Sequence, residues 1–380
     1  MTTSFDKLGL IEPIRRALRN EKYETPTPIQ AQAIPALLAG SDLLGSAQTG
    51  TGKTAAFILP ILQRFAGDMR PCKKRSPRAL ILTPTRELAN QIGASIRKYG
   101  RYLRISHTVV YGGVSIVPQT RALSRNVDIV VATPGRLLDL MRQRMVYLDQ
   151  LEVFTLDEAD RMLDMGFIND VKTIISAIPE TRQTLFFSAT IPRDAMRLAD
   201  RLLRNPVKVQ VNPVYSTVQK VEQKVMFVES RNKEALLLSL LEDETINRAL
   251  IFTRTKHKAN NIAKKLIKHR VQAEAIHGNK SQGARMKALK NFSEGRARVL
   301  VATDVASRGI DIKEVSHVIN FEMPNEPESY VHRIGRTARA GAAGVAISFC
   351  DIDERALLVN IERVTKSELP VDKEHPYHSA

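Results

Sequence analysis

The chain repeats one of its own segments 170 residues further on. Arg78 to Ile92 reads RALILTPTRELANQI, and Arg248 to Ile262 reads RALIFTRTKHKANNI, with nine of fifteen positions identical. The same offset brings the apolar run that ends at Thr133 onto the one that ends at Thr303. A chance match between two apolar strands is common, but two matches in one register predict two domains of the same architecture.

Both copies follow the pattern of an α/β fold. Each repeated segment is a short run of apolar and β-branched residues, followed by Thr and a helix-like stretch. Such strands, alternating with amphipathic helices, indicate a mostly parallel sheet with helices on both faces. The expected strands of the first sheet are 42–47, 78–84, 105–112, 127–134, 152–160 and 183–190; those of the second are 224–229, 248–254, 273–278, 297–304, 317–323 and 345–351.

The pattern divides the chain into four parts. We expect a first domain at 1–208, a linker at 209–218, a second domain at 219–366 and a polar tail at 367–380. The linker is placed where Pro and small polar residues interrupt the periodicity. The tail is expected to fray, because it turns polar beyond about Lys366.

The charge balance points to a polyanionic partner. The chain has 57 Lys and Arg against 40 Asp and Glu, a formal charge of +17. Up to Asn212 there are 30 basic and 19 acidic residues, and the remainder has 27 and 21, so the surplus is not one basic tail. With aromatics at 5% and no Trp, contacts to phosphates and sugars are favoured over base stacking.

Several classes of protein are disfavoured by composition. Two Cys cannot build a disulfide framework or a Cys-based zinc site, and the eight His show no metal-binding spacing. No apolar run approaches the ~20 residues that span a bilayer, and the first residues do not resemble a signal peptide. We expect a cytoplasmic protein with no membrane partner.

A glycine-rich segment in the first half predicts a phosphate site. It reads AQTGTGKT and comprises Ala47, Gln48, Thr49, Gly50, Thr51, Gly52, Lys53 and Thr54. Such a turn between strand and helix presents N–H groups to phosphate oxygens, Lys53 can reach the β- and γ-phosphates, and Thr54 can ligate Mg²⁺. A ligand-free glycine turn is the alternative. The second half has no counterpart, so one ATP per chain is expected.

An acidic pair follows a buried strand about a hundred residues later, in VFTLDEAD. Asp157 can hold Mg²⁺ through water, and Glu158 can polarise the attacking water. The same pair could instead cap the helix that begins ADRML. The upstream phosphate loop favours the catalytic interpretation.

With AQTGTGKT, DEAD and SAT in this order, the chain resembles the DEAD-box RNA helicases. The resemblance runs from Phe5 to about Gly344, and within the family it is greatest to bacterial helicases of the RhlE type. It implies two tandem RecA-like domains, ATP and Mg²⁺ as cofactors, and an RNA substrate.

The resemblance also implies an adenine site in YETPTPIQ. Gln30 would read the adenine edge, Tyr23 would stack on the ring, and Phe5 would buttress the site. Lys22 stands where the family usually has Gly. From the residues alone, a Pro-rich loop with an N-capping Thr is equally consistent.

In HRIGRTARAG, arginines recur every third residue, so we expect Arg333, Arg336 and Arg339 on one side of a helix. The resemblance assigns Arg336 and Arg339 to the γ-phosphate as arginine fingers and Asp311 to the ribose. A basic helix face in contact with solvent or RNA is the alternative. Ala338 replaces a Gly common in this motif, which we expect to be a mild change.

The remaining motifs are assigned by resemblance to coupling and to RNA. Ser188 and Thr190 would couple hydrolysis to strand separation, and His332 would form a hydrogen bond between the domains. The RNA contacts would come from Arg86, Gly112, Gly113, Thr133, Arg136, Arg254, Gln282, Arg285, Thr303 and Asp304. These residue types suit phosphates and 2′-hydroxyls, so binding to single strands or short duplexes would be sequence-nonspecific.

The sequence therefore predicts a monomeric, RNA-stimulated ATPase that separates short duplexes. Ribosomal particles or RNA-decay proteins are the expected further partners. A DNA-directed motor of the same superfamily and an ATP-gated RNA clamp that rarely unwinds stay open as alternatives.

Overall fold

The computed structural model describes residues 4–47, 51–68, 70, 72–211, 221–304, 315–338 and 344–379, apart from the side chain of Glu328. The chain forms two compact units, which we call the N-terminal unit (Met1–Asn212) and the C-terminal unit (Pro213–Ala380). The boundary falls within the predicted linker 209–218, most of which lies outside the described residues.

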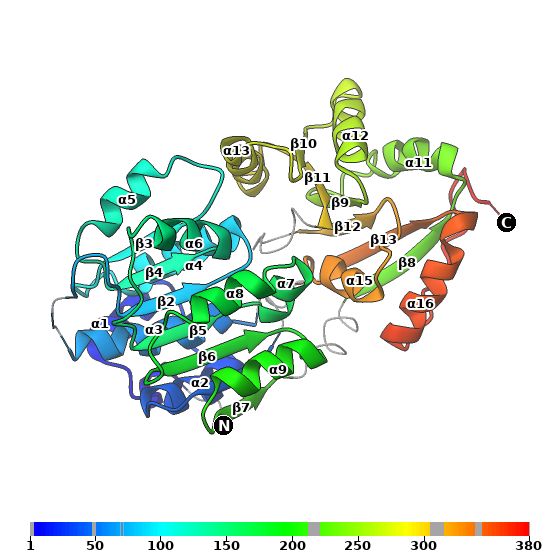
Figure 1. Ribbon diagram of the computed structural model, residues 1–380. Helices are drawn as coiled ribbons and strands as arrows, with labels where there is room; N and C mark the ends of the chain where they lie inside the picture. The colour runs from blue at the N-terminus through cyan, green and yellow to red at the C-terminus, as the bar shows by residue number, and fades with distance from the viewer. Residues whose placement is uncertain are drawn as a thin grey trace. The chain divides into compact units, whose positions relative to one another are not determined.

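The N-terminal unit is built on a parallel sheet with strand order β3-β4-β2-β5-β6-β1-β7 (Figure 1). The strands are β1 (Leu43–Ser46), β2 (Ala79–Leu82), β3 (His107–Val110), β4 (Ile129–Ala132), β5 (Val153–Leu156), β6 (Gln183–Ser188) and β7 (Val207–Gln210). Most of them are buried along their whole length, because helices cover both faces of the sheet. That burial explains their continuous apolar sequences.

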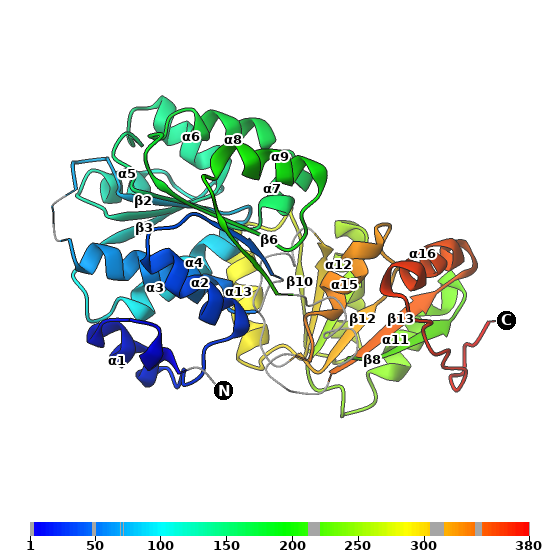
Figure 2. The same ribbon diagram turned by 90° about the horizontal axis from the view of Figure 1, so that it is seen from below.

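Two groups of helices cover this sheet, as Figure 2 shows. One face carries α1 (Glu12–Asn20), α2 (Pro28–Leu38), α3 (Lys53–Ala66) and α4 (Arg86–Tyr99), with the short 3₁₀ helix η1 (Phe5–Lys7). The other carries α5 (Val117–Leu123), α6 (Pro134–Arg142), α7 (Ala159–Asp164), α8 (Ile168–Ile175) and α9 (Arg193–Leu202). No helix in the part of the chain described here is long and apolar enough to cross a membrane.

The C-terminal unit contains a second parallel sheet, with strand order β10-β11-β9-β12-β13-β8. Its strands are β8 (Val221–Phe227), β9 (Ala249–Thr253), β10 (Ala273–Ile276), β11 (Val299–Thr303), β12 (His317–Asn320) and β13 (Gly344–Cys350). Its helices are α11 (Lys233–Leu240), α12 (Lys256–Lys268), α13 (Gln282–Ser293), α15 (Pro327–Ile334) and α16 (Arg355–Thr365), with the 3₁₀ helices η2 (Ser230–Asn232) and η3 (Ile352–Glu354).

The two sheets share one topology, which confirms the predicted α/β fold. The order β3-β4-β2-β5-β6-β1 corresponds strand by strand to β10-β11-β9-β12-β13-β8. The repeated sequence covers β2 with α4 and β9 with α12. Thr85 and Thr255, 170 residues apart, cap these two helices by accepting hydrogen bonds from the Leu88 and Lys258 N–H groups.

Two parts of the chain differ from the sequence prediction. β7 lies at 207–210 and so takes in two residues assigned to the linker; its exposed positions hide it from a search for apolar runs. The tail does not fray as expected. It lies along β8, where the Val225 N–H donates to the Pro370 carbonyl and the Asp372 N–H donates to the Val225 carbonyl.

Two residues that replace family glycines adopt left-handed backbone conformations. Lys22 has a φ of 57° and Ala338 a φ of 53°. Lys22 follows α1 in a Schellman motif, in which the Tyr23 N–H donates to the Leu18 carbonyl and the Lys22 N–H to the Arg19 carbonyl. Because the left-handed region strains any residue with a Cβ, the expectation that Ala338 is a mild change is wrong.

We predict that Lys22→Gly stabilises the N-terminal unit by about 0.5–1 kcal/mol, because it removes Cβ strain at an exposed turn. Scanning calorimetry of the full chain measures the change. Lys22→Ala is the matched control, since it removes the charge but keeps the Cβ. An equal rise in the stability of both variants would show that the charge of Lys22, and not backbone strain, is responsible.

Candidate functional site

The glycine-rich segment lies at the carboxyl end of β1, where ligands bind in open parallel sheets. Ala47 is buried, and its N–H donates to the Ser188 carbonyl at 3.0 Å. Gly52 precedes α3 with a φ of 95°, and Lys53 begins that helix. Thr51 and Thr54 are half-buried, whereas the predicted contacts Gln48, Thr49 and Gly50 lie outside the described residues.

Lys53 and Asp157 are buried polar groups with unsatisfied atoms. Lys53 is 6% exposed and Asp157 2%, and among the described residues neither Lys53 Nζ nor Asp157 Oδ1 has a hydrogen-bond partner. Burial raises the pKa of the Asp157 carboxyl to about 7, although the neighbouring Lys53 ammonium lowers it. Unsatisfied buried groups of opposite charge fit a triphosphate with its Mg²⁺, whose oxygens and charge would satisfy both.

Glu158 is held in a strained backbone conformation, with φ 54° and ψ 53°. It occupies the N-cap position of α7, but its side chain forms no capping hydrogen bond there. The alternative in which the acidic pair only caps a helix therefore loses its support. Such strain costs about 1–3 kcal/mol and is typical of functional sites.

The SAT segment is bonded to the last residue of DEAD. Thr190 donates to Asp160 Oδ2 from its N–H at 2.8 Å and from its hydroxyl at 2.9 Å. Ser188 Oγ accepts from the Asp160 N–H at 3.2 Å and donates to the Thr190 carbonyl at 2.5 Å. With the bond from Ala47 to Ser188, this links the acidic segment, SAT and the phosphate loop.

Gln30, from the predicted adenine site, is buried against the phosphate loop. Its Nε2 donates to the Gly52 carbonyl at 3.1 Å, and its Oε1 accepts from the Thr27 N–H at 2.9 Å. A Cβ on Gly52 would lie 2.5 Å from Gln30 Nε2 and 2.8 Å from Thr27 Oγ1. Glycine is thus required at Gly52 both by its φ and by this close approach.

The two predicted aromatic contacts are packed into the N-terminal unit. Phe5 is buried in the core that α1 to α4 form on one face of the sheet. Tyr23 is half-buried, with its ring 6.1 Å from that of Tyr99 and 5.9 Å from the Lys98 ammonium. Phe5 therefore belongs to the same hydrophobic core against which Tyr23 packs.

The residues predicted to bind RNA in the N-terminal unit follow β2, β3 and β4, which are neighbours in the sheet. The Arg86 guanidinium lies over the Gly112–Gly113 turn, 3.7 Å from where a Cβ on Gly112 would be. Arg136 Nη2 donates to the Val114 carbonyl at 3.1 Å. Thr133 precedes α6 at the end of β4. The fold thus gathers three sequence motifs at one edge.

The corresponding edge of the C-terminal unit carries the other predicted RNA contacts. Arg254 follows β9, Gln282 and Arg285 begin α13 after β10, and Thr303 ends β11. Asp304 has a structural partner, because its two carboxylate oxygens accept from Arg333 Nε at 2.6 Å and Nη2 at 2.7 Å.

The arginine motif departs from the expected single helix face. α15 ends at Ile334, so Arg336 lies in the turn beyond it, where it is buried. Arg333 is a core residue, 1% exposed, that also donates to Asn320 and to the Glu322 carbonyl. His332 is half-buried in the last turn of α15, while Arg339 and Asp311 lie outside the described residues.

One buried ionic cluster was not predicted. Lys233 and Glu354 are both buried and ion-paired, and Asp351 and Arg254 also belong to the cluster. The only available sequence signal is DIDE at 351–354, in which Asp351 and Glu354 form a capping box around η3.

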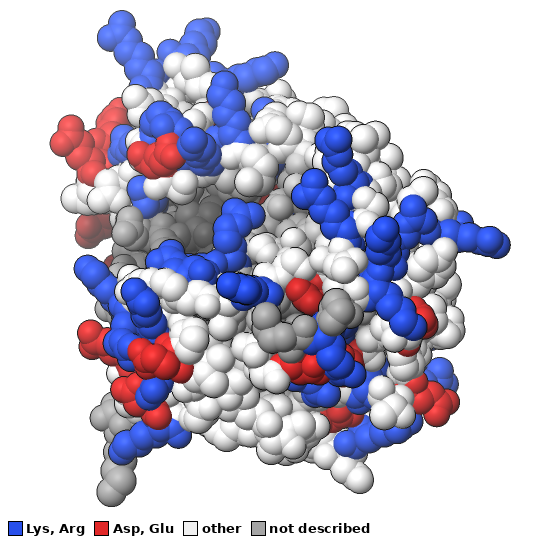
Figure 3. Space-filling model, turned by 90° about the vertical axis from the view of Figure 1, so that its left-hand side faces the viewer, with Lys and Arg blue, Asp and Glu red and all other residues white. Residues whose placement is uncertain are grey.

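Figure 3 shows one face of the molecule, on which Lys and Arg side chains are more numerous than Asp and Glu and are spread among uncharged ones. The basic surplus on this face is dispersed, so it supports an extended anionic partner over a single point of attachment.

Comparison with known proteins agrees with this geometry. Residues 27–198 match the DEAD/DEAH box helicase family model, and 232–341 match the helicase conserved C-terminal domain. The DEAD-box ATP-dependent RNA helicase CshA of Bacillus cereus is 44% identical over 367 residues, which cover 97% of this chain and 69% of that protein. This chain belongs to the DEAD-box family of ATP-dependent RNA helicases. It is therefore an RNA-stimulated ATPase that uses ATP with Mg²⁺.

Further relatives support the assignment. CshA of Bacillus subtilis is 43% identical over 98% of this chain and 75% of its own length. Saccharomyces cerevisiae Dbp5 bound to RNA and ADP BeF3 has a TM-score of 0.87 and 32% identity, over 97% of this chain and 95% of that one. Mss116p bound to ssRNA and AMP-PNP also has a TM-score of 0.87, at 27% identity, over 99% and 80%. These relatives do not support the predicted RhlE type.

We predict that Gly52→Ala raises the KM for ATP more than tenfold while the fold is retained. The added Cβ would strain a φ of 95° and displace Gln30 and Thr27, at a cost above about 1–2 kcal/mol. Gly67→Ala, at the other end of α3, is the control, because its nearest neighbours would lie 3.7 Å away. An unchanged KM in Gly52→Ala would contradict the role of this loop in nucleotide binding.

Proposed function

We propose that this helicase couples ATP hydrolysis on the N-terminal unit to the binding of an RNA backbone by both units. The observation that carries the proposal is the hydrogen-bond chain from Asp160 through Thr190 and Ser188 to Ala47. Because this chain joins the segments that follow β1, β5 and β6, a change at the phosphate loop would be transmitted to the acidic segment. Hydrolysis would thereby alter the edge that holds RNA.

In this mechanism each residue at the nucleotide has a separate task. Lys53 binds the β- and γ-phosphates, Thr54 and Asp157 hold Mg²⁺, and Glu158 orients and polarises the attacking water. When held there, Mg²⁺ would supply positive charge to balance the charge that develops on the phosphoryl oxygens. Gln30, fixed against Gly52, presents its amide to the adenine edge, with Tyr23 beside it.

The C-terminal unit would complete this site. By family resemblance, Arg336 and Arg339 act on the γ-phosphate and Asp311 on the ribose, and His332 forms a hydrogen bond between the domains. Arginine fingers of this kind are worth about 10³–10⁵ in rate. If ATP and RNA are both needed to assemble the site, RNA stimulates ATP hydrolysis by induced fit.

We propose that RNA lies along the equivalent edges of the two sheets. In the N-terminal unit Arg86, Gly112, Gly113, Thr133 and Arg136 would bind phosphates and 2′-hydroxyls. Arg254, Gln282, Arg285 and Thr303 would do so in the C-terminal unit. Asp304 is better assigned to positioning, because Arg333 occupies its carboxylate and a carboxylate repels phosphate.

The proposal extends to the biological setting. Single strands or short duplexes of any sequence would be substrates, and ribosomal particles or RNA-decay proteins are the proposed partners of a monomeric enzyme. Cys72 and Cys350 are buried free thiols, which suits a cytoplasmic enzyme. Comparing the ATPase stimulation by RNA with that by DNA of the same sequence distinguishes an RNA helicase from a DNA-directed motor. Comparing the lifetime of the protein on RNA with its unwinding rate distinguishes a helicase from an ATP-gated clamp.

We predict that Glu158→Gln abolishes RNA-stimulated ATP hydrolysis but preserves ATP-dependent RNA binding. The amide keeps the size of the side chain, whereas it cannot polarise water as a carboxylate does. Phosphate release and fluorescence anisotropy of a labelled RNA measure the two activities on one preparation. Retained turnover would remove Glu158 from its catalytic role, and lost RNA binding would show that it acts on the structure.

A second prediction concerns the RNA edge of the N-terminal unit. Gly113→Ala should weaken RNA binding by roughly tenfold, because the Cβ would clash with the Arg86 guanidinium at a φ of 76°. Gly112→Ala is the adjacent control: it keeps the backbone N–H through which Gly112 would bind phosphate, and its Cβ would only contact Arg86, so the Kd should change less than about twofold. Equal effects from the two variants would contradict a role for the placement of Arg86.

A further inference from the structure

The C-terminal unit contains a position equivalent to the ATP-binding position of the N-terminal unit. β8 occupies the place in its sheet that β1 occupies in the other. The helix after β1 begins at Lys53, and the helix after β8 begins at Lys233. Both lysines are buried at the same point of the shared topology.

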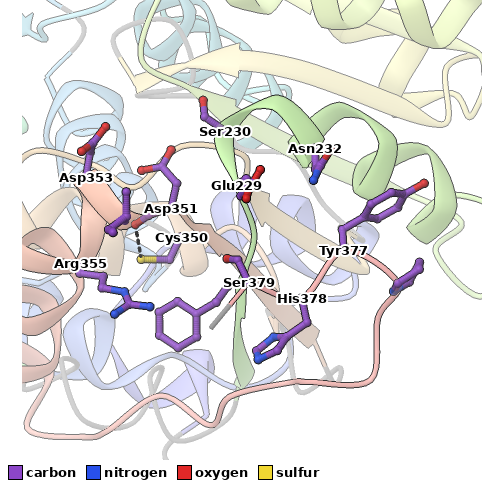
Figure 4. A pocket seen from close by; sticks show the side chains of 13 residues that line it. Glu229, Ser230, Asn232, Cys350, Asp351, Asp353, Arg355, Tyr377, His378 and Ser379 are labelled. Atoms are coloured by element: carbon purple, nitrogen blue, oxygen red, sulfur yellow. Dashed lines mark hydrogen bonds between the residues drawn. The ribbon is translucent and has the colours of Figure 1, made fainter.

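The two lysines differ in their partners. In the described residues Lys53 Nζ has no hydrogen-bond partner, whereas Lys233 Nζ donates to Glu354 and lies 2.9 Å from Asp351. The chain's own carboxylates thus surround the ammonium that could otherwise bind phosphate. Asp351 also lines a cavity of about 550 Å³ between the end of β8 and the tail, shown in Figure 4 with Glu229 and Tyr377 on its walls.

Glu354 connects this position to the RNA edge. It is buried, and besides Lys233 it accepts hydrogen bonds from the Arg254 guanidinium and, at 3.1 Å, from the Met323 N–H. The Arg254 N–H donates to Glu322 Oε2 at 2.8 Å. Arg254 is therefore fixed at its backbone and at one end of its side chain, while the side chain remains 35% exposed.

We propose that Glu354 is a positioning residue that presents Arg254 to an RNA phosphate, with Lys233 compensating its buried charge. The inference deepens the proposed function, because it rests on Arg254 as an RNA contact. A guanidinium has five N–H donors, and among the described residues the Arg254 side chain gives only Nη2 to a partner. The remaining donors can bind a phosphate without releasing Glu354.

The physical advantage is a contact oriented in advance. A free arginine loses side-chain entropy when it binds phosphate, and a side chain already held by Glu354 has lost it on folding. The gain expected from this is about threefold to tenfold in RNA affinity. The equivalent of the ATP site would thus serve RNA binding in the C-terminal unit.

A double-mutant cycle on the full chain tests the proposal. The variants are Glu354→Gln, Arg254→Ala and the double variant, and the Kd for a labelled single-stranded RNA is measured with a non-hydrolysable ATP analogue. Glu354→Gln combined with Lys233→Met provides a second form that leaves no uncompensated lysine, in case the single variant folds poorly. Glu234→Gln is the control, because Glu234 pairs with Lys258 and Lys265 instead.

We expect Glu354→Gln, alone or with Lys233→Met, to raise the Kd for RNA about threefold to tenfold, with the KM for ATP unchanged. Added to Arg254→Ala, it should have no further effect. Two outcomes would overturn the positioning role of Glu354 but not the RNA contact of Arg254. One is that the two substitutions raise the Kd for RNA independently; the other is that both Glu354 variants bind RNA normally while Arg254→Ala binds it more weakly. Normal binding in Arg254→Ala would overturn the RNA contact itself and this inference with it.

Discussion

Parallel pairing of the strands is the constraint on which the rest of the structure depends. In a parallel sheet every carboxyl end lies at the same edge, so residues that follow different strands meet there. Lys53 after β1 and Asp157 after β5 are brought together in this way, as are Arg86 and Gly113 after β2 and β3. The residues proposed to bind nucleotide and RNA in the N-terminal unit therefore occupy two halves of one edge.

The sequence predicted those features that are encoded by burial or by local turns. Strands buried along their length give continuous apolar runs, and the phosphate loop needs Gly52 at a positive φ. β7 was not predicted as a strand, because it lies at the sheet edge and Val209 is its one buried residue. The docking of the tail was not predicted, because it depends on contacts between residues far apart in the sequence: backbone hydrogen bonds to β8, the ion pair of Lys224 with Asp372 and the burial of Leu369.

Long-range polar contacts explain what the sequence missed in the site. Lys233 and Glu354 are 121 residues apart, and neither spacing nor composition pairs them. The end of α15 was locally readable, since Gly335 caps the helix, but the regular spacing of the arginines suggested that it continued. Family resemblance gave Thr190 a coupling role, but its contact with Asp160 was not predicted, because a Thr after a strand has many possible partners.

The same contacts change the meaning of the net charge. Arg78 is bonded inside the N-terminal unit to Asp68 and Glu152, Arg333 to Asp304, and Lys233 to Glu354. In each case a buried cation is paired with at least one carboxylate, so the sum of +17 stays while the number of cations that can meet RNA falls. In the proposed function, affinity for RNA therefore depends on which arginines remain exposed and oriented at the carboxyl edges, and the positioning role proposed for Glu354 would let a buried carboxylate increase it.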